Sequence, residues 1–115
     1  MGSATINSAR SAVVFSQVGD NDVLVPGIEG RSIVVHAIMF APVYQAGELT
    51  SYGLWDSDGN IIIPQNNTAF PDANGVTPPL IYPYNQSGWG VCAPGASLKS
   101  LSSNGMDGIV VFTIR

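Results

Sequence analysis

The chain has 115 residues and a mass of 12.0 kDa, which suffices for one hydrophobic core but not for two. Its net charge is −4 and its four basic residues are scattered, so they form no cluster that could neutralise nucleic-acid phosphates. Only 10% of the residues are charged, against about 25% in ordinary soluble domains. This scarcity favours a surface partly covered by other proteins, and the alternative is a low-charge monomer.

Cysteine usage and hydropathy exclude further classes of protein. Cys92 is the only cysteine, so no disulfide can form within the chain, and we expect its thiol to pack as a small buried hydrophobe. The N-terminal residues lack the basic and then apolar pattern of a signal peptide. The longest apolar runs have the length of a strand, so we expect no transmembrane helix and no membrane partner.

Glycine and proline punctuate the chain too often for long helices. There are 13 glycines and 8 prolines, and no stretch keeps an apolar 3.6-residue period for three turns. Short β-branched runs separated by turn residues instead predict an all-β fold, a single-domain sandwich of about eight antiparallel strands. Residues 1–10 are polar and unpatterned and are predicted to form an N-terminal arm, while residues 11–115 form the sandwich domain.

The first half of the chain contains three predicted strands. Residues 12–17 form the first, and residues 19–22, rich in Gly, Asp and Asn, form the turn that closes it. A short strand over 22–25 follows. Residues 32–40 are apolar at almost every position, which is typical of a strand buried on both faces. We expect one of these faces in the core and the other against a loop or a neighbouring subunit.

The second half combines regular strands with one irregular stretch. Residues 56–60 predict a hairpin turn, and Pro64 is expected to end the strand pairing that follows it. Residues 64–88 are rich in Pro, Asn and Gly and predict a long loop containing one short strand. The expected strands of this half are residues 49–55, 61–63, 80–82, 89–93, 96–101 and 108–114.

The residues that could carry chemistry do not assemble into a catalytic or metal site. His36 is the only histidine, so clusters of several histidines around zinc or iron are excluded. Asp56, Asp58 and Asn60 are spaced like the start of a calcium loop, but the glycine and glutamate that such a loop needs further on are missing. Cys92 and His36 are expected in strands with structural roles. We therefore predict no catalytic residue, no metal and no cofactor.

Aromatic side chains allow two interpretations. Trp55, Tyr82, Tyr84 and Trp89 could stack on sugar rings, as in a carbohydrate-binding module or a fibre-tip domain. They could equally pack in the core and against other subunits, since Tyr and Trp bury much area and keep a polar group. We favour core and subunit contacts and keep sugar binding as the alternative.

The order of these features resembles a family of small phage virion proteins, the head decoration or cement proteins with a β-sandwich of jelly-roll type. The likeness covers about two-thirds of the chain and consists of packing patterns. The Pro-rich stretch 64–88 is longer than this layout implies. The matching segments are residues 12–17, the short Val-Leu-Val strand before Pro26-Gly27, residues 33–40, and the block from Trp89 through Pro94-Gly95 to residues 108–112.

The resemblance implies a homotrimer on the outer surface of a phage capsid, bridging major capsid proteins. Its threefold repetition would multiply a modest contact area through effective concentration. Apolar strand faces would form the trimer interface, for which we name Ile38, Phe40 and Tyr52. The residues expected to contact the capsid or a ligand are Trp55, Tyr82, Tyr84 and Arg10.

Overall fold

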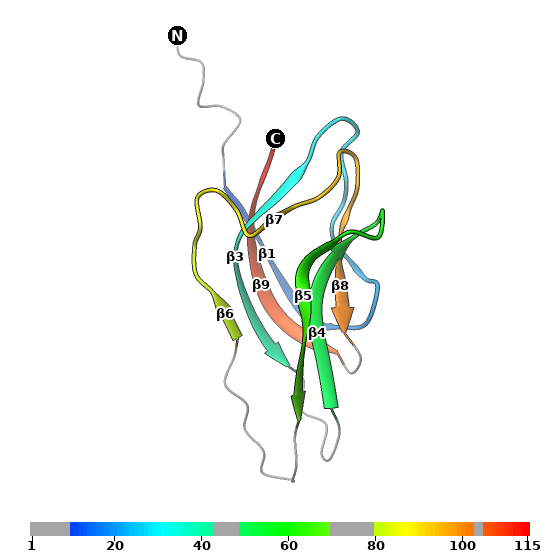
Figure 1. The fold of residues 1–115 in the computed structure, drawn as a ribbon, viewed down its shortest axis with the longest axis vertical. Coiled ribbons are helices and arrows are strands. Elements are labelled where there is room, and N and C mark those ends of the chain that lie inside the picture. Colours follow the sequence, from blue (N-terminus) through cyan, green and yellow to red (C-terminus); the bar gives the residue numbers. More distant parts are fainter. Residues whose placement is uncertain (1–9, 43–48, 70–79, 103–104) are drawn as a thin grey trace.

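All regular structure in the described part of the chain is β-strand (Figure 1). The structure is a computed structural model, and it describes residues 10–42, 49–69, 80–102 and 105–115. It confirms the predicted all-β class, with nine strands where about eight were expected. The strands are β1 (Ser11–Val18), β2 (Val23–Val25), β3 (Ile33–Pro42), β4 (Leu49–Asp56), β5 (Ile61–Ala69), β6 (Leu80–Tyr82), β7 (Gly90–Val91), β8 (Leu98–Ser102) and β9 (Met106–Ile114).

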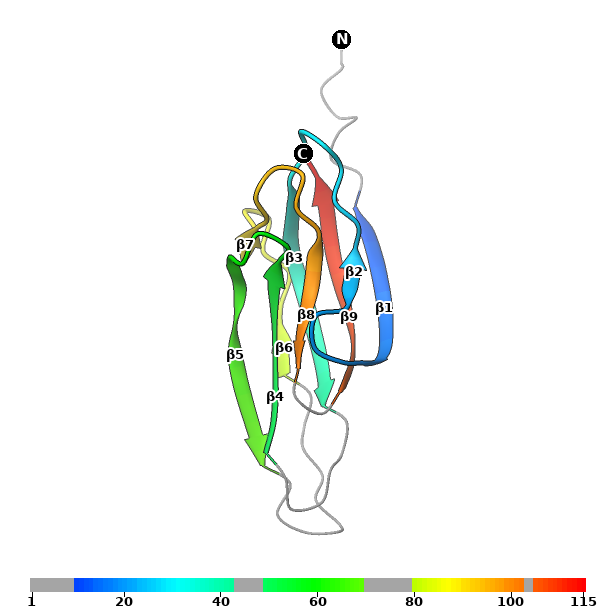
Figure 2. The same ribbon diagram turned by 90° about the vertical axis from the view of Figure 1, so that its right-hand side faces the viewer.

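The strands form two antiparallel sheets that face each other (Figure 2). One sheet has the order β1-β9-β3-β6, with β7 also paired to β3, and the other has the order β2-β8-β4-β5. The pairs are nested along the chain, β1 with β9, β2 with β8, β3 with β6 and β7, and β4 with β5. One long hairpin rolled onto itself produces this nesting, which is the topology of a jelly roll. The predicted jelly-roll sandwich is therefore confirmed.

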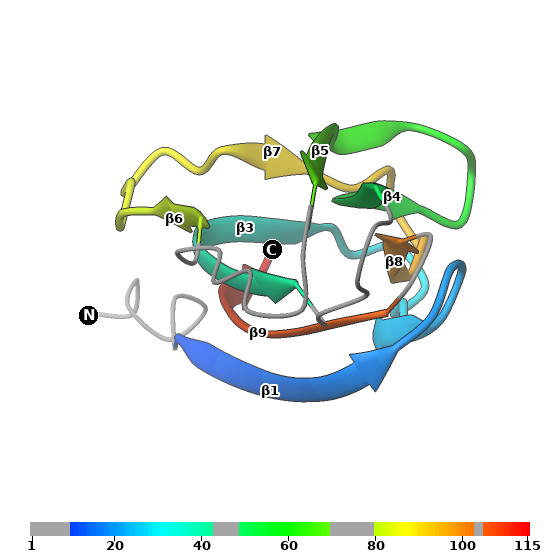
Figure 3. The same ribbon diagram turned by 90° about the horizontal axis from the view of Figure 1, so that it is seen from below.

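The core lies between the two sheets (Figure 3). Strand alternation sends every second side chain inward, which is why Ile33 and Val35 belong to the core while Val34 points to the other side of the sheet, where it is also buried. An aromatic chain crosses the core, since Phe40 packs edge-on against Tyr52 at 5.3 Å and against Tyr82 at 6.3 Å. The fully enclosed core side chains include Phe40, Ile33, Leu54, Ile63, Leu98, Met106, Val35 and Val110.

The predicted turn at 56–60 is confirmed as the hairpin that joins β4 to β5. Its first residue, Asp56, points inward and is only 1% exposed. The Asp56 carboxylate accepts hydrogen bonds from the backbone N–H of Asp58, Asn60 and Ala93 at 2.9 to 3.0 Å. This carboxylate therefore holds the tip of the long hairpin against the segment that leads into β8.

The prediction that Pro64 ends the strand pairing was wrong, because β5 continues to Ala69. Strand β5 is at the edge of its sheet, where a missing N–H is tolerated. The register also shifts here, since Tyr52 pairs Asn66 while Leu54 pairs Ile63. Pro64 thus lies in a β-bulge, a second setting that accepts proline.

The predicted loop over 64–88 is correspondingly shorter in the structure. Residues 64–69 belong to β5 and residues 80–82 form β6, as expected for the short strand. Residues 70–79 lie outside the described part of the chain, as do residues 1–9 of the predicted N-terminal arm. The segment that remains irregular is 83–89, which joins β6 to β7 along one side of β3 (Figure 1).

Candidate functional site

The outer face of the β1-β9-β3-β6 sheet carries a row of long apolar side chains. Val14 on β1 pairs with Ile109 on β9, and Ile109 pairs with Met39 on β3. Met39 in turn pairs with Ile81 on β6, so four strands contribute to one row. Val14 is 74% exposed and Ile81 is 60% exposed, while Met39 and Ile109 are half-buried between them. Exposed rows of this kind are uncommon on a surface that meets only water.

A second apolar row runs beside the first. Ala12 pairs with Val111, and Val111 pairs with Ala37, two residues further along each strand. Side chains two apart on a strand share a face, so both rows lie on the outside of the sheet. We call these two rows the apolar face; its members are Val14, Ile109, Met39, Ile81, Ala12, Val111 and Ala37.

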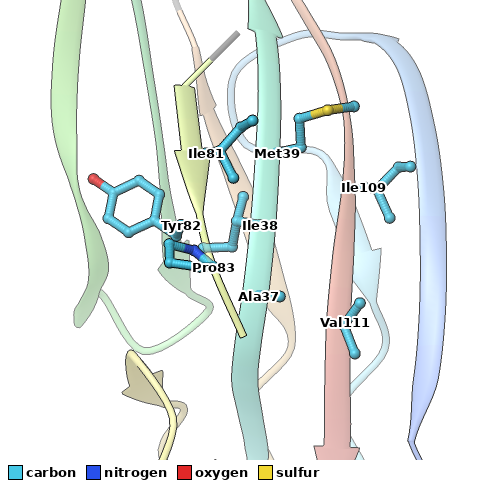
Figure 4. A pocket seen from close by; sticks show the side chains of 8 residues that line it. All are labelled: Ala37, Ile38, Met39, Ile81, Tyr82, Pro83, Ile109 and Val111. Carbon is cyan, nitrogen blue, oxygen red and sulfur yellow. The ribbon is translucent and has the colours of Figure 1, made fainter. Parts of the chain in front are cut away.

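The apolar face is hollowed on both sides of the pair formed by Met39 and Ile109. One hollow of about 220 Å³ lies toward β6, and Figure 4 shows Met39, Ile81 and Ile109 around it. Its other lining residues include Pro83 and Tyr82. The other hollow, of about 270 Å³, lies toward β1 and extends to Ser16, Ala41 and Asp107. The face therefore has the relief that a complementary protein surface could fill.

One end of the apolar face is closed by a stack of three side chains. Tyr84 stacks on the ring of His36 at 5.5 Å, and the guanidinium carbon of Arg10 lies 4.8 Å from the centre of the Tyr84 ring. Arg10 precedes β1 while His36 belongs to β3, so this arrangement directs the Arg10 side chain across the sheet. The opposite end of the face carries Asp107, which pairs with Ala41. The face is thus basic at one end and acidic at the other.

His36 holds the 83–89 segment against the sheet. Its Nδ1 lies 2.9 Å from the carbonyl oxygen of Asn85, and its Nε2 lies 2.8 Å from the hydroxyl of Thr113. A carbonyl only accepts hydrogen bonds, so Nδ1 donates to it, and in the neutral imidazole Nε2 then accepts from the Thr113 hydroxyl. His36 is the extra residue at the register shift between Val35 and Ala37, a bulge that aims its ring at this segment. The sequence predicted that a loop or a neighbouring subunit covers the outer side of β3. The 83–89 segment is such a loop, and it covers the first half of this strand.

The three residues named for the trimer interface lie inside a single chain. Ile38 is 2% exposed, Phe40 is 0% exposed and Tyr52 is 4% exposed. All three belong to the core between the sheets, so their side chains already pack against other residues of the same chain. Alternation explains the misplacement, because the long apolar run of β3 gives no sign of which alternate set faces outward. Met39, the neighbour of Ile38 and Phe40, is the residue that reaches the outer face.

The residues named for contact with a capsid or ligand are divided between the two sheets. Tyr82, Tyr84 and Arg10 lie at β6, at the 83–89 segment and before β1, around the same end of one sheet. Trp55 belongs to β4 in the other sheet, where its Nε1 donates to the carbonyl oxygen of Ser100 at 3.0 Å. The structure therefore brings Arg10 and Tyr84 into contact, packs the Tyr82 ring against Phe40 on the core side of the sheet, and separates Trp55 from all three.

Cys92 and His36, the pair weighed as a nucleophile and its base, have separate environments. Both ring nitrogens of His36 are engaged by Asn85 and Thr113. Cys92 is 1% exposed, as its predicted packing role requires. Burial, together with the nearby negative charge of Asp56, raises the pKa of the Cys92 thiol to about 12. A thiol in that state is a poor nucleophile at neutral pH.

Asp56, Asp58 and Asn60 form a hydrogen-bonded turn. Burial by itself would raise the pKa of Asp56, but hydrogen bonds from Ala93, Asn60 and Asp58 together hold it below its ordinary value. Asn60 also donates its side-chain amide to both carboxylate oxygens. Within the described residues, no three His, Cys, Asp or Glu side chains are placed to share a metal ion. The same part of the chain has no helix with the length and hydropathy needed to span a lipid bilayer.

Sequence reasoning missed the apolar face as a unit. The alternation within each strand did indicate outward-facing residues, because Val14, Met39 and Ile109 each lie next to a residue that the structure places in the core. What joins them into one row is the register of four strands that are distant along the chain. Comparisons with known family models, with curated proteins and with solved structures gave no match for this chain. The resemblance to phage decoration proteins therefore stays a prediction.

Proposed function

We propose that this chain is a structural virion protein that decorates the outer surface of a phage capsid as a homotrimer, bridging major capsid proteins and stabilising the shell. The observation that carries the proposal is the apolar face, in which Val14 and Ile81 leave more than half of their side-chain surface exposed on a regular sheet. Burying such side chains against another protein contributes about 25 cal/mol for each Å² of apolar area removed from water. In an assembly, a neighbouring protein would cover this apolar surface.

Two further features support the proposal. The chain has few charges, and interface cores are depleted of charge. The jelly-roll topology agrees with the fold that the resemblance implies, although folds of this type also serve lectins and enzymes. The trimeric state itself rests on the resemblance. Native mass spectrometry tests it directly, and a stable monomer at micromolar concentration would reject the trimer.

Binding to capsids is tested with a matched pair of substitutions. Ile81 on β6 and Ile61 on β5 are 60% and 58% exposed, and they lie on strands of different sheets. We expect the unaltered protein to co-sediment with purified phage capsids that lack their decoration protein. Ile81→Asp should weaken this binding at least about tenfold, which corresponds to about 1.4 kcal/mol. Ile61→Asp introduces the same charge at the same exposure and should bind like the unaltered protein.

Two outcomes of this experiment count against the proposal. Absence of binding by the unaltered protein contradicts the decoration function, because a decoration protein must recognise the assembled shell. Equal loss of binding by Ile81→Asp and Ile61→Asp contradicts the role of the apolar face, since an effect of charge alone would not depend on which sheet carries it. Imaging of particles with and without the protein then locates the contact on the shell.

A second candidate, glycan binding, has one observation in its favour. Tyr84 and Trp89 are 46% and 40% exposed, and the polar residues 85–87 lie between them. Both rings are already engaged, however, since Tyr84 stacks on His36 and the Trp89 Nε1 donates to the carbonyl oxygen of Pro83 at 2.8 Å. A glycan array separates the two candidates, because binding of sugars by this chain in the absence of capsids would favour the second.

A further inference from the structure

The edge formed by β1 lacks the protection that the other sheet edges have in the described part of the chain. Edge strands offer unpaired N–H and C=O groups to other chains, and proteins usually block them with short strands, proline, charges or bulges. Strand β2 has three residues and ends before Pro26, and β5 contains Pro64 in a bulge. The edge opposite β1 consists of β7, with two residues, and β6, with three residues followed by Pro83. Strand β1 has eight residues without charge or proline, and its register is regular from Ser11 to Phe15, before its own bulge.

Backbone hydrogen bonds at the end of β9 show which of its residues face β1. The N–H groups of Ser32 and Arg115 each donate to the carbonyl oxygen of the other at 2.9 Å, so the backbone groups of Arg115 point to the β3 side. In an antiparallel ladder, successive residues direct these groups to opposite sides. The even-numbered residues of 108–114 therefore point toward β1. The carbonyl of Ile33, the partner of residue 114, agrees with this, since it accepts from Cys92 on the other side of β3.

The same alternation leaves two residues of β1 with outward-directed backbone groups. Ser11, Val13 and Phe15 lie opposite even-numbered residues of β9, which point their N–H and C=O groups at them. Ala12 and Val14 therefore direct their own N–H and C=O groups away from β9, along the edge of the sheet. Both side chains are exposed, Val14 at 74%. Figure 3 shows β1 at the margin of the sandwich with no described strand beyond it, so this edge is open to a further strand.

We propose that β1 pairs edge to edge with β1 of a second copy of this chain, antiparallel and about a two-fold axis at Val13, so that two β1-β9-β3-β6 sheets become one continuous sheet. Ala12 of each copy then lies opposite Val14 of the other, and the two residues exchange both of their outward hydrogen bonds. The inference goes beyond the proposed function and does not depend on it, because the contact uses the edge of the sheet and leaves the apolar face uncovered.

The side chains of β1 favour its own copy as the partner. Antiparallel two-fold pairing places Val13 opposite its own image and Ser11 opposite Phe15, and no charged residue lies in this segment. Like charges directly opposite each other are destabilising, whereas β-branched and aromatic neighbours stabilise a pair of strands. Between Ala12 and Val14 a small side chain meets a larger one, both on the apolar face. The segment is therefore complementary to itself in backbone and in side chains.

The paired copies would expose their apolar faces on the same side. In a continuous antiparallel sheet, the two-fold axis between neighbouring strands is perpendicular to the sheet, so rotation about it keeps each face on its own side. The two apolar faces then join across the seam formed by Ala12 and Val14. A two-fold contact cannot close a ring of three, so in a homotrimeric assembly it would connect copies of neighbouring trimers.

The contact is short, so we expect it to be weak. Five residues of a strand extend for about 17 Å. A strip of this length and one strand wide buries well under the roughly 1,200 Å² that is typical of stable complexes. We therefore expect reversible association of the copies, with a dissociation constant of about 10 to 500 μM.

Sedimentation velocity of the purified chain, without capsids, tests the association. From about 5 μM to about 1 mM the mass should double, from one copy to two or from three copies to six. Ala12→Pro removes the N–H that Ala12 directs at the second copy and should raise the dissociation constant at least about tenfold. Edge strands tolerate proline at such a position, and circular dichroism checks the fold. Ala12→Ser keeps the N–H, and Ile81→Asp alters the apolar face at the opposite edge, so both should stay within about threefold of the unaltered protein.

Disulfide trapping tests the register and does not depend on how the proline variant folds. At the axis, Val13 forms a non-hydrogen-bonded pair with its own image, in which the Cα atoms are about 4.5 Å apart and within reach of a disulfide. Val13→Cys should therefore give a cross-linked pair of chains under mild oxidation. Ser11→Cys is the matched control, because residue 11 would lie about 14 Å from its image and should not cross-link. The native Cys92 is 1% exposed and does not compete.

Three results would overturn the inference. The first is an unaltered protein whose mass stays constant up to about 1 mM. The second is association that Ala12→Pro does not weaken, or that Ile81→Asp weakens as much, since the contact would then not use the edge. The third is cross-linking of Ser11→Cys as fast as that of Val13→Cys. The capsid experiment is independent: capsid binding without self-association keeps the proposed function and rejects the edge contact, and self-association without capsid binding does the reverse.

Discussion

Replacing Asp56 with alanine is expected to lower the free energy of unfolding by about 4 kcal/mol. The Asp56 side chain is 1% exposed and accepts three backbone hydrogen bonds, from Asp58, Asn60 and Ala93. A hydrogen bond to a charged group contributes about 1.5 kcal/mol or more, and a buried donor left unpaired costs a comparable amount. Ala93 precedes β8 and Asn60 precedes β5. Removing the carboxylate therefore removes the hydrogen bonds that connect two segments far apart along the chain.

Urea denaturation monitored by tryptophan fluorescence measures this effect. With a denaturant slope of about 2 kcal/mol/M, the midpoint should fall by about 2 M urea. Asp56→Asn keeps one acceptor oxygen but points an N–H₂ group at one of the donors, so we expect about half of the loss. Asp58→Ala changes an exposed carboxylate in the same turn and should stay within about 0.5 kcal/mol of the unaltered protein.

The pH dependence follows from the direction of the Asp56 pKa. Its hydrogen bonds hold the pKa below the ordinary value, so the folded state binds this proton less tightly than the unfolded state. The stabilisation is then complete above the ordinary carboxyl range and is lost as the pH falls through the lower pKa of the folded protein. The difference in the free energy of unfolding between the unaltered protein and Asp56→Asn should become smaller as the pH falls from 7 to about 3. If Asp56→Ala lowers the free energy of unfolding by less than about 1 kcal/mol at pH 7, this reasoning is refuted. It is also refuted if the loss does not change with pH.

Two further predictions concern Gly88 and Cys92. Gly88 has a φ of +93°, and an added Cβ would lie 2.6 Å from Cγ1 of Val34, so Gly88→Ala should destabilise the protein by about 2 kcal/mol or more in the same urea assay. Gly59 has a similar φ of +89° with open space around it, so Gly59→Ala should cost only about 1 kcal/mol, and equal losses would reject the contact with Val34. The Cys92 thiol should not react with a disulfide reagent at pH 8 until urea unfolds the protein, because it is 1% exposed and its pKa is raised to about 12. Rapid labelling of the folded protein would contradict this placement.

The sequence was sufficient to predict the strands, because their ends are marked by residues with strong local preferences. Gly, Asp and Asn around position 20 and at positions 56–60 form the two expected turns. Asn21 adopts a positive φ of 68°, a conformation that asparagine tolerates better than most residues. Where the local preference conflicted with the tertiary setting, at Pro64, the prediction failed. An edge strand with a bulge accepts proline, and edge position is decided by partners distant along the chain.

The assignment of faces could not be predicted from the same information. Residues 33–40 are almost all apolar, so alternation alone allowed either set to face the core. The structure places Ile38 and Phe40 inside and leaves Met39 outside. The expected covering of both faces of this strand was correct for its first half, where the 83–89 segment lies over Val34 and His36.

The sequence by itself determined the fold class, the approximate positions of the strands apart from the end of β5, the two turns, and the buried state of Cys92. These depend on composition and on preferences that act within a few residues. Only the tertiary structure decided that Val14, Ile109, Met39 and Ile81 form one row, because nested pairing brings together strands that are up to about 90 residues apart. The same pairing sets Arg10 and Asp107 at opposite ends of the apolar face. A surface composed of single residues from four strands exists only once the chain has rolled up.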